Sequence, residues 1–380
     1  MTPSRGSLAR TLARSDVSSS SAPLLIWATR AFWEDAAVEG VLPLIAAAVG
    51  ARGWEGVPED VRADALRRTR EEAARAELSG RDLRRVLAAF NGQSIPALVL
   101  KGTALGYTHY GGLANRPRLD VDLLIRRDDI GRAHEIFRSL EAEYVPHVTG
   151  RFVMSQFHYV TTDRAGCKHA YDVHWRIVNG HRFAGALSFD EMFADAAVPD
   201  ALAAVRGRVP SPVHALLLAC VHRAAHHAAR GPLIWLYDLH LLTERLDTSE
   251  RQAVLEIAAA RGLAGIAAHS LAEAGAMFGV GATAALAAEL RARGGDRAGV
   301  DRFLESRGSR ARALLDDLAV LAGWRSRIAL VREVLFPPAA YMRHAYAPGS
   351  AAPLGLLYLR RAVRGAAGFL GVRQPFQGLR

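Results

Sequence analysis

Cysteine is nearly absent from this chain of 380 residues, which contains only Cys167 and Cys220. The two are not spaced as metal ligands and cannot build a disulfide framework, so a zinc ribbon and a disulfide-stapled secreted domain are excluded. A reducing environment suits such a chain, and we expect a cytoplasmic protein. Long hydrophobic runs are also lacking, because no stretch approaches the roughly 18 apolar residues of a membrane span. We therefore expect no stable membrane insertion.

Lysine is almost missing as well. Only two of the 48 basic residues are lysines, Lys101 and Lys168, and the others are arginines. The formal net charge of +10 permits nucleotide, nucleic-acid or acidic-lipid partners, although a solvated basic surface is the more common meaning of such a charge. Half of the residues are hydrophobic and 23% are charged, which provides a sizeable core and excludes wholesale disorder.

Composition and periodicity divide the chain into five parts. Residues 1–22 are basic and Ser-rich without the apolar core of a secretory signal, and they are predicted to be a flexible leader. Residues 23–91 have apolar positions at helical spacing, and residues 210–345 are helical throughout. Residues 346–380 form a basic tail, in which LLYLRRAVRGAAGFLG predicts a basic amphipathic helix that either packs or touches a membrane surface.

The remaining part, residues 92–200, is predicted to form a sheet that makes up the core of the fold. IPALVL and LDVDLLI are predicted strands, each followed by a helical or loop segment. RFVMSQFHYVTT and CKHAYDVHWRIV are also strand-like, and the DRAG turn between them predicts a hairpin. The fold class is therefore α/β (α+β): a small mixed sheet flanked by helices, with N-terminal helices before it and an all-helical region after it.

Three aspartates interrupt the apolar strands of this core. Side chains alternate between the faces of a strand, so Asp120 and Asp122 point to the same side, and Asp172 lies on another predicted strand. Carboxylates this close repel each other unless a cation is bound, and Mg²⁺ uses one or two carboxylates together with phosphate oxygens. A third carboxylate could complete a two-metal cluster. The alternative for a bare D-x-D is a strand end with two solvated acids.

Residues suited to phosphate precede these carboxylates. Lys101-Gly102-Thr103 stands where a strand ends and a helix can begin, so that glycine and the helix amides could approach an anion. Otherwise Lys101 merely marks a strand end. Arg116 and Arg118 could grip a triphosphate bidentately, and strand parity with Asp120 favours Arg118.

Several histidines are further candidates. His174 shares a strand face with Asp172 and could reach the second shell of a metal or an acceptor. His222 and His226 lie four residues apart on one face of a predicted helix, where they could bind zinc, although the metalloprotease pattern H-E-x-x-H is not present. They could instead contact phosphate or an acceptor, or simply pack. Asp238 could orient one of them or be structural.

Together these motifs resemble those of a known family. The chain is similar to the uncharacterised nucleotidyltransferase family of the DNA polymerase beta-like superfamily, which has Lys-Gly where the superfamily usually has Gly-Ser. The downstream segments PVHALLLACVHRAAHH and WLYDL also match its pattern. The core of the resemblance lies in Lys101-Gly102, Tyr110, Arg116, Asp120-Val121-Asp122 and Asp172-Val173-His174-Trp175.

The resemblance implies a metal-dependent nucleotidyltransferase. Such an enzyme moves a nucleoside monophosphate from an NTP to a hydroxyl or phosphate acceptor and releases pyrophosphate. Asp120, Asp122 and Asp172 would hold Mg²⁺ or Mn²⁺, and the acceptor would be a small molecule, a peptide product or an RNA end. Two alternatives stay open: a non-catalytic nucleotide-binding or regulatory module, and an enzyme that uses the same site for another phosphoryl transfer.

Overall fold

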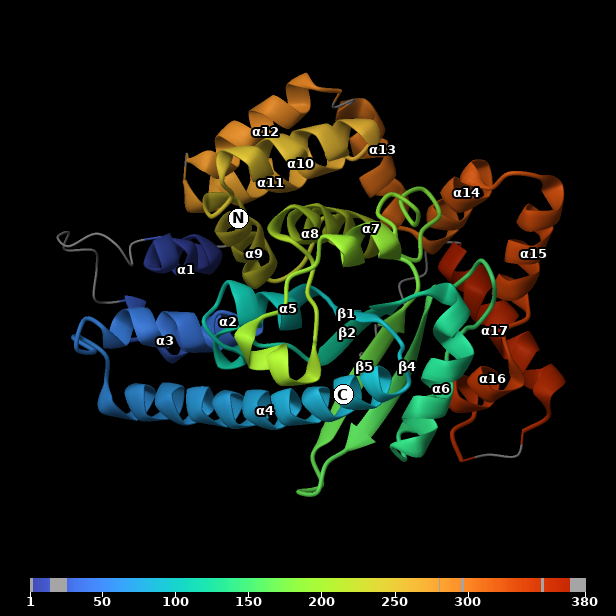
Figure 1. Ribbon diagram of the computed structural model, residues 1–380, viewed down its shortest axis with the longest axis horizontal. Coiled ribbons are helices and arrows are strands. Elements are labelled where there is room, and N and C mark those ends of the chain that lie inside the picture. The colour runs from blue at the N-terminus through green and yellow to red at the C-terminus, as the bar shows by residue number, and fades with distance from the viewer. Residues whose placement is uncertain (1–2, 14–25, 280, 295–296, 350–351, 370–380) are drawn as a thin grey trace.

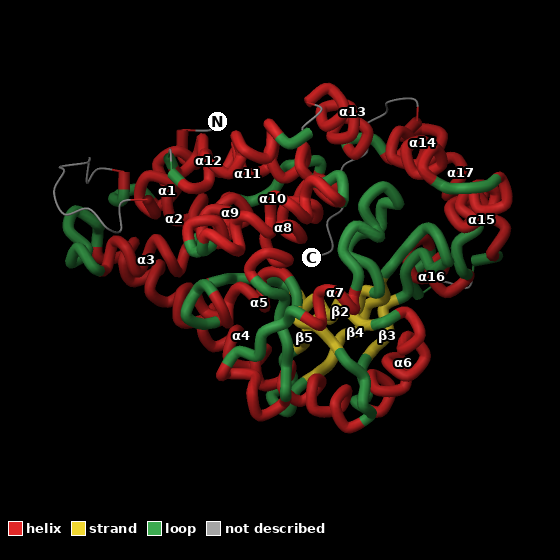
Figure 2. The backbone as a smooth tube through the Cα atoms, turned by 45° about the horizontal axis from the view of Figure 1, so that its top comes forward, coloured by secondary structure: helices red, strands yellow, loops and turns green. Residues whose placement is uncertain are grey.

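The structure is a computed structural model, and it describes residues 3–13, 26–279, 281–294, 297–349 and 352–369. Helices dominate it and surround one small mixed sheet, as Figures 1 and 2 show, so the predicted α+β class is confirmed. Among the described residues, no helix combines the length and the apolar character that crossing a bilayer requires.

The sheet has five strands in the order β1-β2-β5-β4-β3. Only β2 and β5 run parallel to each other, and the other neighbours are antiparallel. The predicted hairpin is present as β4 and β5, whereas β3 was not expected from the sequence. The strands are β1 (Ala97–Val99), β2 (Asp120–Ile125), β3 (Glu143–Val145), β4 (Gln156–Thr162) and β5 (Lys168–His174).

One face of the sheet packs against two helices. Val121 and Leu123 of β2 and Tyr171 and Val173 of β5 are buried in one cluster with apolar residues of α4 (Glu59–Gly92) and α6 (Ile130–Ser139). Helix α4 follows Pro58, carries two acidic residues in its first turn, and ends at Gly92, where the sequence predicts a stop. Alternation along the strands therefore leaves Asp120, Asp122 and Asp172 on the opposite face.

That opposite face is covered by α5 (Lys101–Thr108), α8 (Pro212–His227) and α9 (Leu233–Glu244), and Leu98 and Leu124 of the sheet join their apolar core. The side chain of Ser211 caps the start of α8, and Pro212 occupies its first turn. Between residues 26 and 309, the other α-helices of the described chain are α2 (Arg30–Val38), α3 (Leu42–Gly50), α7 (Phe189–Ala194), α10 (Thr248–Ala260), α11 (Ala264–Phe278), α12 (Ala282–Ala292) and α13 (Arg297–Arg307).

The predicted flexible leader is only partly described, and the described part is a helix. Residues 3–13 form α1 (Pro3–Ala13), which packs on α3 and α11, and residues 14–22 lie outside the described ranges. Leu8 and Leu12 are four residues apart and both buried, so one apolar stripe holds the helix in place. Arg5 also pairs with Glu39 at 2.5 Å. The flexible leader that the basic, Ser-rich composition predicts is therefore wrong for residues 3–13.

The C-terminal helices α14 (Arg310–Val320), α15 (Trp324–Leu335), α16 (Ala339–Tyr346) and α17 (Leu354–Phe369) gather on the right of Figure 1. Glu333 of α15 joins them to the loop before β4, because its carboxylate accepts hydrogen bonds from the backbone N–H groups of Arg151, Phe152 and Val153 at 2.8–3.0 Å. Gly150 makes room for this contact, since a Cβ atom there would collide with the same carboxylate.

Candidate functional site

A cleft of about 650 Å³ lies between the polar face of the sheet and the helices α5, α8 and α9. The cleft is lined by all eight residues that the sequence suggests for binding the nucleotide or its metal ion: Lys101, Gly102, Thr103, Arg116, Arg118, Asp120, Asp122 and Asp172. His222 and His226 of α8 also line it, so α8 forms part of the wall of the cleft.

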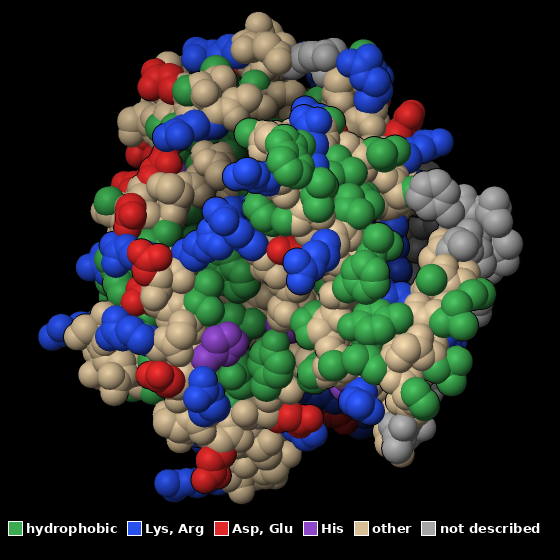
Figure 3. All heavy atoms as spheres, turned by 90° about the vertical axis from the view of Figure 1, so that its right-hand side faces the viewer, with side chains coloured by type: hydrophobic (Ala, Val, Ile, Leu, Met, Phe, Trp, Pro, Cys, Tyr) green, Lys and Arg blue, Asp and Glu red, His purple; other side chains and the backbone are tan. Residues whose placement is uncertain are grey.

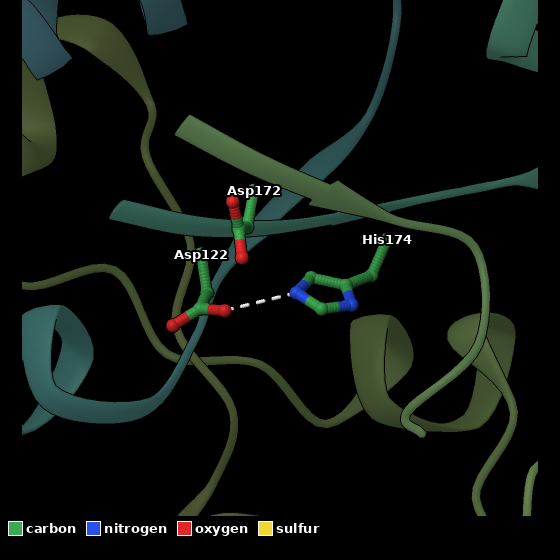
Figure 4. A group of neighbouring side chains, drawn as sticks. All are labelled: Asp122, Asp172 and His174. Carbon is green, nitrogen blue, oxygen red and sulfur yellow. Dashed lines mark hydrogen bonds and ion pairs between the residues drawn. The ribbon is translucent and has the colours of Figure 1, made fainter. Parts of the chain in front are cut away.

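Two carboxylates meet at the floor of the cleft. Asp122 of β2 and Asp172 of β5 are direct partners across the parallel strand pair. Together with His174 they form a group in which one potential ligand atom of each residue lies within 4.8 Å of the others. Figure 4 shows the two carboxylates side by side, with the imidazole of His174 reaching Asp122. Asp120 lines the same cleft but does not belong to this tight group.

Asp122 is held by two neighbours. Its Oδ1 lies 2.6 Å from Nζ of Lys101 and 2.9 Å from Nε2 of His174. Burial alone would raise the pKa of Asp122, but the Lys101 ammonium and the hydrogen bond from His174 outweigh it and lower that pKa below its ordinary value. Burial and the charge of Lys101 lower the pKa of His174, so its Nε2–H donates from a neutral ring. Asp122 is therefore an anion in the folded protein.

Asp120 behaves in the opposite way. Burial, followed by repulsion from Asp122 and Asp172, raises the pKa of Asp120 to about 7. Repulsion among these carboxylates therefore persists although Lys101 lies beside Asp122. A divalent cation among these oxygens would relieve that repulsion, because carboxylates are the ligands that Mg²⁺ and Mn²⁺ prefer.

Asp172 has two further neighbours, which were not predicted from the sequence. His158 of β4 contacts its Oδ1 through Nδ1, and the Nε2 of Gln156 donates to Oδ2 at 3.2 Å. His158 is the register partner of Asp172 in the hairpin, and Gln156 lies two residues before it on the same face. Both side chains fix the orientation of the Asp172 carboxylate toward the cleft.

The Lys-Gly turn brings backbone close to the same floor. Lys101 begins α5 with φ +52°, a left-handed conformation that is uncommon for a residue with a side chain. A Cβ atom at Gly102 would lie 3.2 Å from the guanidinium carbon of Arg116, so only glycine fits there without a shift. Because the first N–H groups of a helix have no partner within it, this turn can present them to an anion.

Arg116, which the sequence suggests as a triphosphate ligand, forms an ion pair within the protein. Its Nε and Nη2 donate to the two oxygens of Asp238 at 2.7 and 2.6 Å, and its Nη1 donates to the carbonyl of Pro117. Tyr110 donates its hydroxyl to the same Asp238 at 2.7 Å. The guanidinium fork is thus occupied by Asp238, and a bidentate grip on triphosphate would require that ion pair to open. Tyr110, Arg116 and Asp238 form a buried brace between the Lys-Gly turn and α9.

Arg118 has more freedom to bind a ligand. Its Nη2 donates to the hydroxyl of Ser79 at 3.1 Å, whereas its buried Nε finds no hydrogen-bond partner among the described residues. Burial lowers the pKa of Arg118 despite the nearby Tyr107 and Glu72. Of the two arginines, Arg118 is therefore the better candidate for a phosphate contact, as strand parity predicts.

The histidines on α8 form the upper wall of the cleft. The ring centroids of His222 and His226 lie 4.9 Å apart, and His227 lies 5.1 Å from His222. They do not form a three-residue metal-ligand group within the described part of the chain. His226 accepts a hydrogen bond from the backbone N–H of Asn179 at its Nε2, and burial followed by the charge of Lys101 lowers its pKa to about 3.

The pKa of His226 predicts how stability depends on pH. In the unfolded chain His226 has a pKa near 6.5, so below that pH the unfolded state binds a proton that the folded state does not. The contribution of neutral His226 to the free energy of unfolding is therefore complete above about pH 6.5, and it is lost as the pH falls toward 3. We expect His226→Asn to be less stable than the wild type at pH 7.5, with a smaller difference at pH 5. Urea unfolding at both values tests this, and a difference independent of pH would contradict it.

One comparison with known proteins identifies a family for the chain. The model of the family described as "Uncharacterised nucleotidyltransferase" matches residues 28–279, a range that contains the cleft and both of its walls. No curated protein matches the chain. A crystal structure of JHP933 from Helicobacter pylori is 15% identical over 64% of this chain and 98% of that one, with a TM-score of 0.30, too low to support any inference. The chain belongs to the uncharacterised nucleotidyltransferase family.

Proposed function

We propose that this protein is a metal-dependent nucleotidyltransferase that moves a nucleoside monophosphate from an NTP to a small hydroxyl-bearing acceptor. The observation that carries the proposal is the pairing of Asp122 with Asp172 across parallel strands, beside Lys101 and in a cleft that also contains Asp120 and Arg118. Carboxylates that could hold a cation therefore lie beside basic side chains that could bind a triphosphate.

The donor set fits a hard divalent cation. Asp120, Asp122 and Asp172 supply carboxylate oxygens, which suit Mg²⁺ and Mn²⁺, and they would hold the ion. The imidazole of His174 already donates to Asp122, so it orients a ligand rather than replacing one. When bound, the cation would neutralise phosphate charge and lower the pKa of the acceptor hydroxyl.

The chain's own residues would then bind and orient the reactants. The Lys101-Gly102 turn and Arg118 would hold the triphosphate, and the wall formed by His222, His226 and Trp235 would position the acceptor. In the reaction, the acceptor oxygen forms a bond to the α-phosphorus, the bond to the pyrophosphate oxygen breaks, and the hydroxyl proton passes to solvent.

The cleft favours a small acceptor over RNA. Its volume of about 650 Å³ lies in the range of small-molecule sites and would have to hold the nucleotide as well. Of the Lys and Arg side chains that line it, Arg116 and Arg223 are already paired with Asp238 and Glu273, which leaves Lys101 and Arg118. A long RNA strand would need a continuous basic track.

Position-specific labelling of the nucleotide tests the proposal. We expect label from α-³²P-NTP, supplied with Mg²⁺ or Mn²⁺ and a host extract, to enter an acceptor while label from γ-³²P-NTP appears in pyrophosphate. Transfer of the γ label would indicate another phosphoryl transfer instead. Nucleotide binding without transfer of either label, with all four NTPs and both metals, would indicate a binding module. Asp122→Asn serves as the inactive control.

A further inference from the structure

The C-terminal helices expose large apolar side chains. A groove of about 610 Å³ lies between α14 and α15, and four of its lining side chains are more than half exposed: Leu315 62%, Ile328 57%, Leu335 56% and Phe336 63%. We call these four residues the α14–α15 face. Trp324, at the start of α15, is 67% exposed. Figure 3 shows hydrophobic side chains gathered across the middle of this side of the molecule, with Lys and Arg side chains among them.

Helix α17 has the same character. Leu356, Leu359 and Val363 are each at least 56% exposed. The helix is fixed beside α15, because Tyr358 donates its hydroxyl to the carbonyl of Pro337 and Arg361 donates to the carbonyl of Val334. An exposed apolar surface of this extent is unusual for a protein that functions without a partner.

The charge on these helices is one-sided. Residues 310–365 contain nine arginines and three acidic residues. Each acidic residue already has a partner elsewhere: Asp316 and Asp317 bind Arg182 and Arg307, and Glu333 binds backbone N–H groups of residues 151–153. Arg327 and Arg332 line the apolar groove itself. The helices therefore offer aliphatic and aromatic groups together with uncompensated positive charge.

Exposed apolar groups combined with positive charge favour one kind of binding partner over others. Nucleic acid would satisfy the arginines but would gain little from Ile328 or Leu335, because its phosphates and sugars are polar. A second copy docked through the same face would bring two surfaces of the same positive charge together. An anionic bilayer satisfies both features, since acyl chains accept the apolar groups while lipid phosphates bind guanidinium.

We propose that α14, α15 and α17 form a docking surface for anionic lipid bilayers, on which the protein lies without crossing the membrane. The surface lies outside residues 28–279, the range shared with the nucleotidyltransferase family, and the proposal does not depend on the proposed reaction. Apolar insertion supplies adhesion, and the arginines select membranes that carry negative charge.

Vesicle sedimentation of the full chain tests this. We expect the protein to sediment with vesicles of phosphatidylcholine mixed with phosphatidylglycerol, to bind vesicles of phosphatidylcholine alone much more weakly, and to be released by high salt. Arg327→Glu with Arg332→Glu should lower the partition coefficient at least about tenfold, because each arginine near an anionic surface contributes about fivefold. Ile328→Ser with Leu335→Ser should weaken binding by a similar factor or more.

The matched control is Val198→Ser, which removes a 43% exposed apolar side chain outside these helices and should leave vesicle binding unchanged. Unfolding temperatures of all variants show whether they remain folded. Equal binding to neutral and anionic vesicles, or binding to neither, would overturn the proposal. It would also be overturned if the α15 variants kept vesicle binding but abolished a dimer in light scattering, because the occupant would then be a second copy.

Discussion

Asp122→Asn is expected to lower the rate of nucleotidyl transfer by several orders of magnitude, equivalent to about 4–6 kcal/mol in the barrier. The substitution removes a negative charge and one strong cation ligand while keeping the size of the side chain. Transfer of a nucleotide needs that charge to balance the phosphates and to lower the pKa of the acceptor hydroxyl. Single-turnover rates at saturating Mg²⁺ measure the effect, because weaker metal affinity alone could imitate a slower reaction.

The same substitution should also weaken folding in the absence of metal. Judged from sequence alone, relief of repulsion among the carboxylates would keep or even improve stability. The structure reverses that expectation, because Asp122 is the partner of both Lys101, at 2.6 Å, and His174, at 2.9 Å. An Asn leaves a mostly buried ammonium without its counter-ion. Since the pKa of Asp122 is lowered on folding, its contribution is present above its unfolded pKa of about 4 and disappears as the pH falls below it.

Two further variants make the result interpretable. Asp172→Asn should slow transfer in the same way, because it changes the carboxylate directly opposite Asp122. Asp128→Asn changes an exposed aspartate in the short helix η3 (Arg127–Asp129), outside the cleft, and should leave turnover nearly intact. Near-normal turnover by Asp122→Asn under saturating metal would mean that this carboxylate is not part of the reaction centre.

Strand periodicity made the cleft carboxylates predictable. A residue spacing of two placed Asp120 and Asp122 on one face, and the apolar frame of AYDVHW placed Asp172 on a neighbouring strand. The hairpin contains one more signal. If the turn is centred on residues 163–167, His158 pairs with Asp172 across the two strands, so the contact between this histidine and the carboxylate is predictable from the sequence.

Other features depend on tertiary contacts that periodicity does not encode. The pairing of Arg116 with Asp238 joins residues 122 positions apart, and neither side chain reveals its partner in the sequence. For the same reason the sequence suggests Arg116 as a triphosphate ligand without revealing its ion pair, and it predicts a flexible leader that includes residues 3–13, although α3 and α11 hold these residues in place as a helix. Polar residues whose partners lie far away in the chain were thus the hardest to interpret.

Replacing Arg116 by Met should lower the free energy of unfolding by about 3–5 kcal/mol, because it strands a buried carboxylate. Arg116 and Asp238 are each 5% exposed, and two of the three hydrogen bonds that Asp238 accepts from side chains come from this guanidinium. Met has a similar length but donates nothing, so Asp238 would keep only the hydroxyl of Tyr110. Urea unfolding of the wild type and the variant measures the loss.

The matched control is Arg81→Met. Arg81 also forms an ion pair, with Glu77 at 2.9 Å, but both side chains are more than half exposed on α4. Removing that pair should cost less than about 1 kcal/mol. Arg116→Lys should recover only part of the loss, because an ammonium cannot reproduce the fork that reaches both oxygens of Asp238.

A double variant separates the ion pair from the shape of the side chain. If stranding the carboxylate is the cause, Arg116→Met combined with Asp238→Leu should be less destabilised than the sum of the two single changes, with a coupling of about 1–3 kcal/mol. Simple additivity would show that Arg116 stabilises the fold through its other contacts, which are the hydrogen bond to the carbonyl of Pro117 and the packing against Gly102. In that case Arg116 would support the chain around Gly102 and Pro117, and not the buried brace.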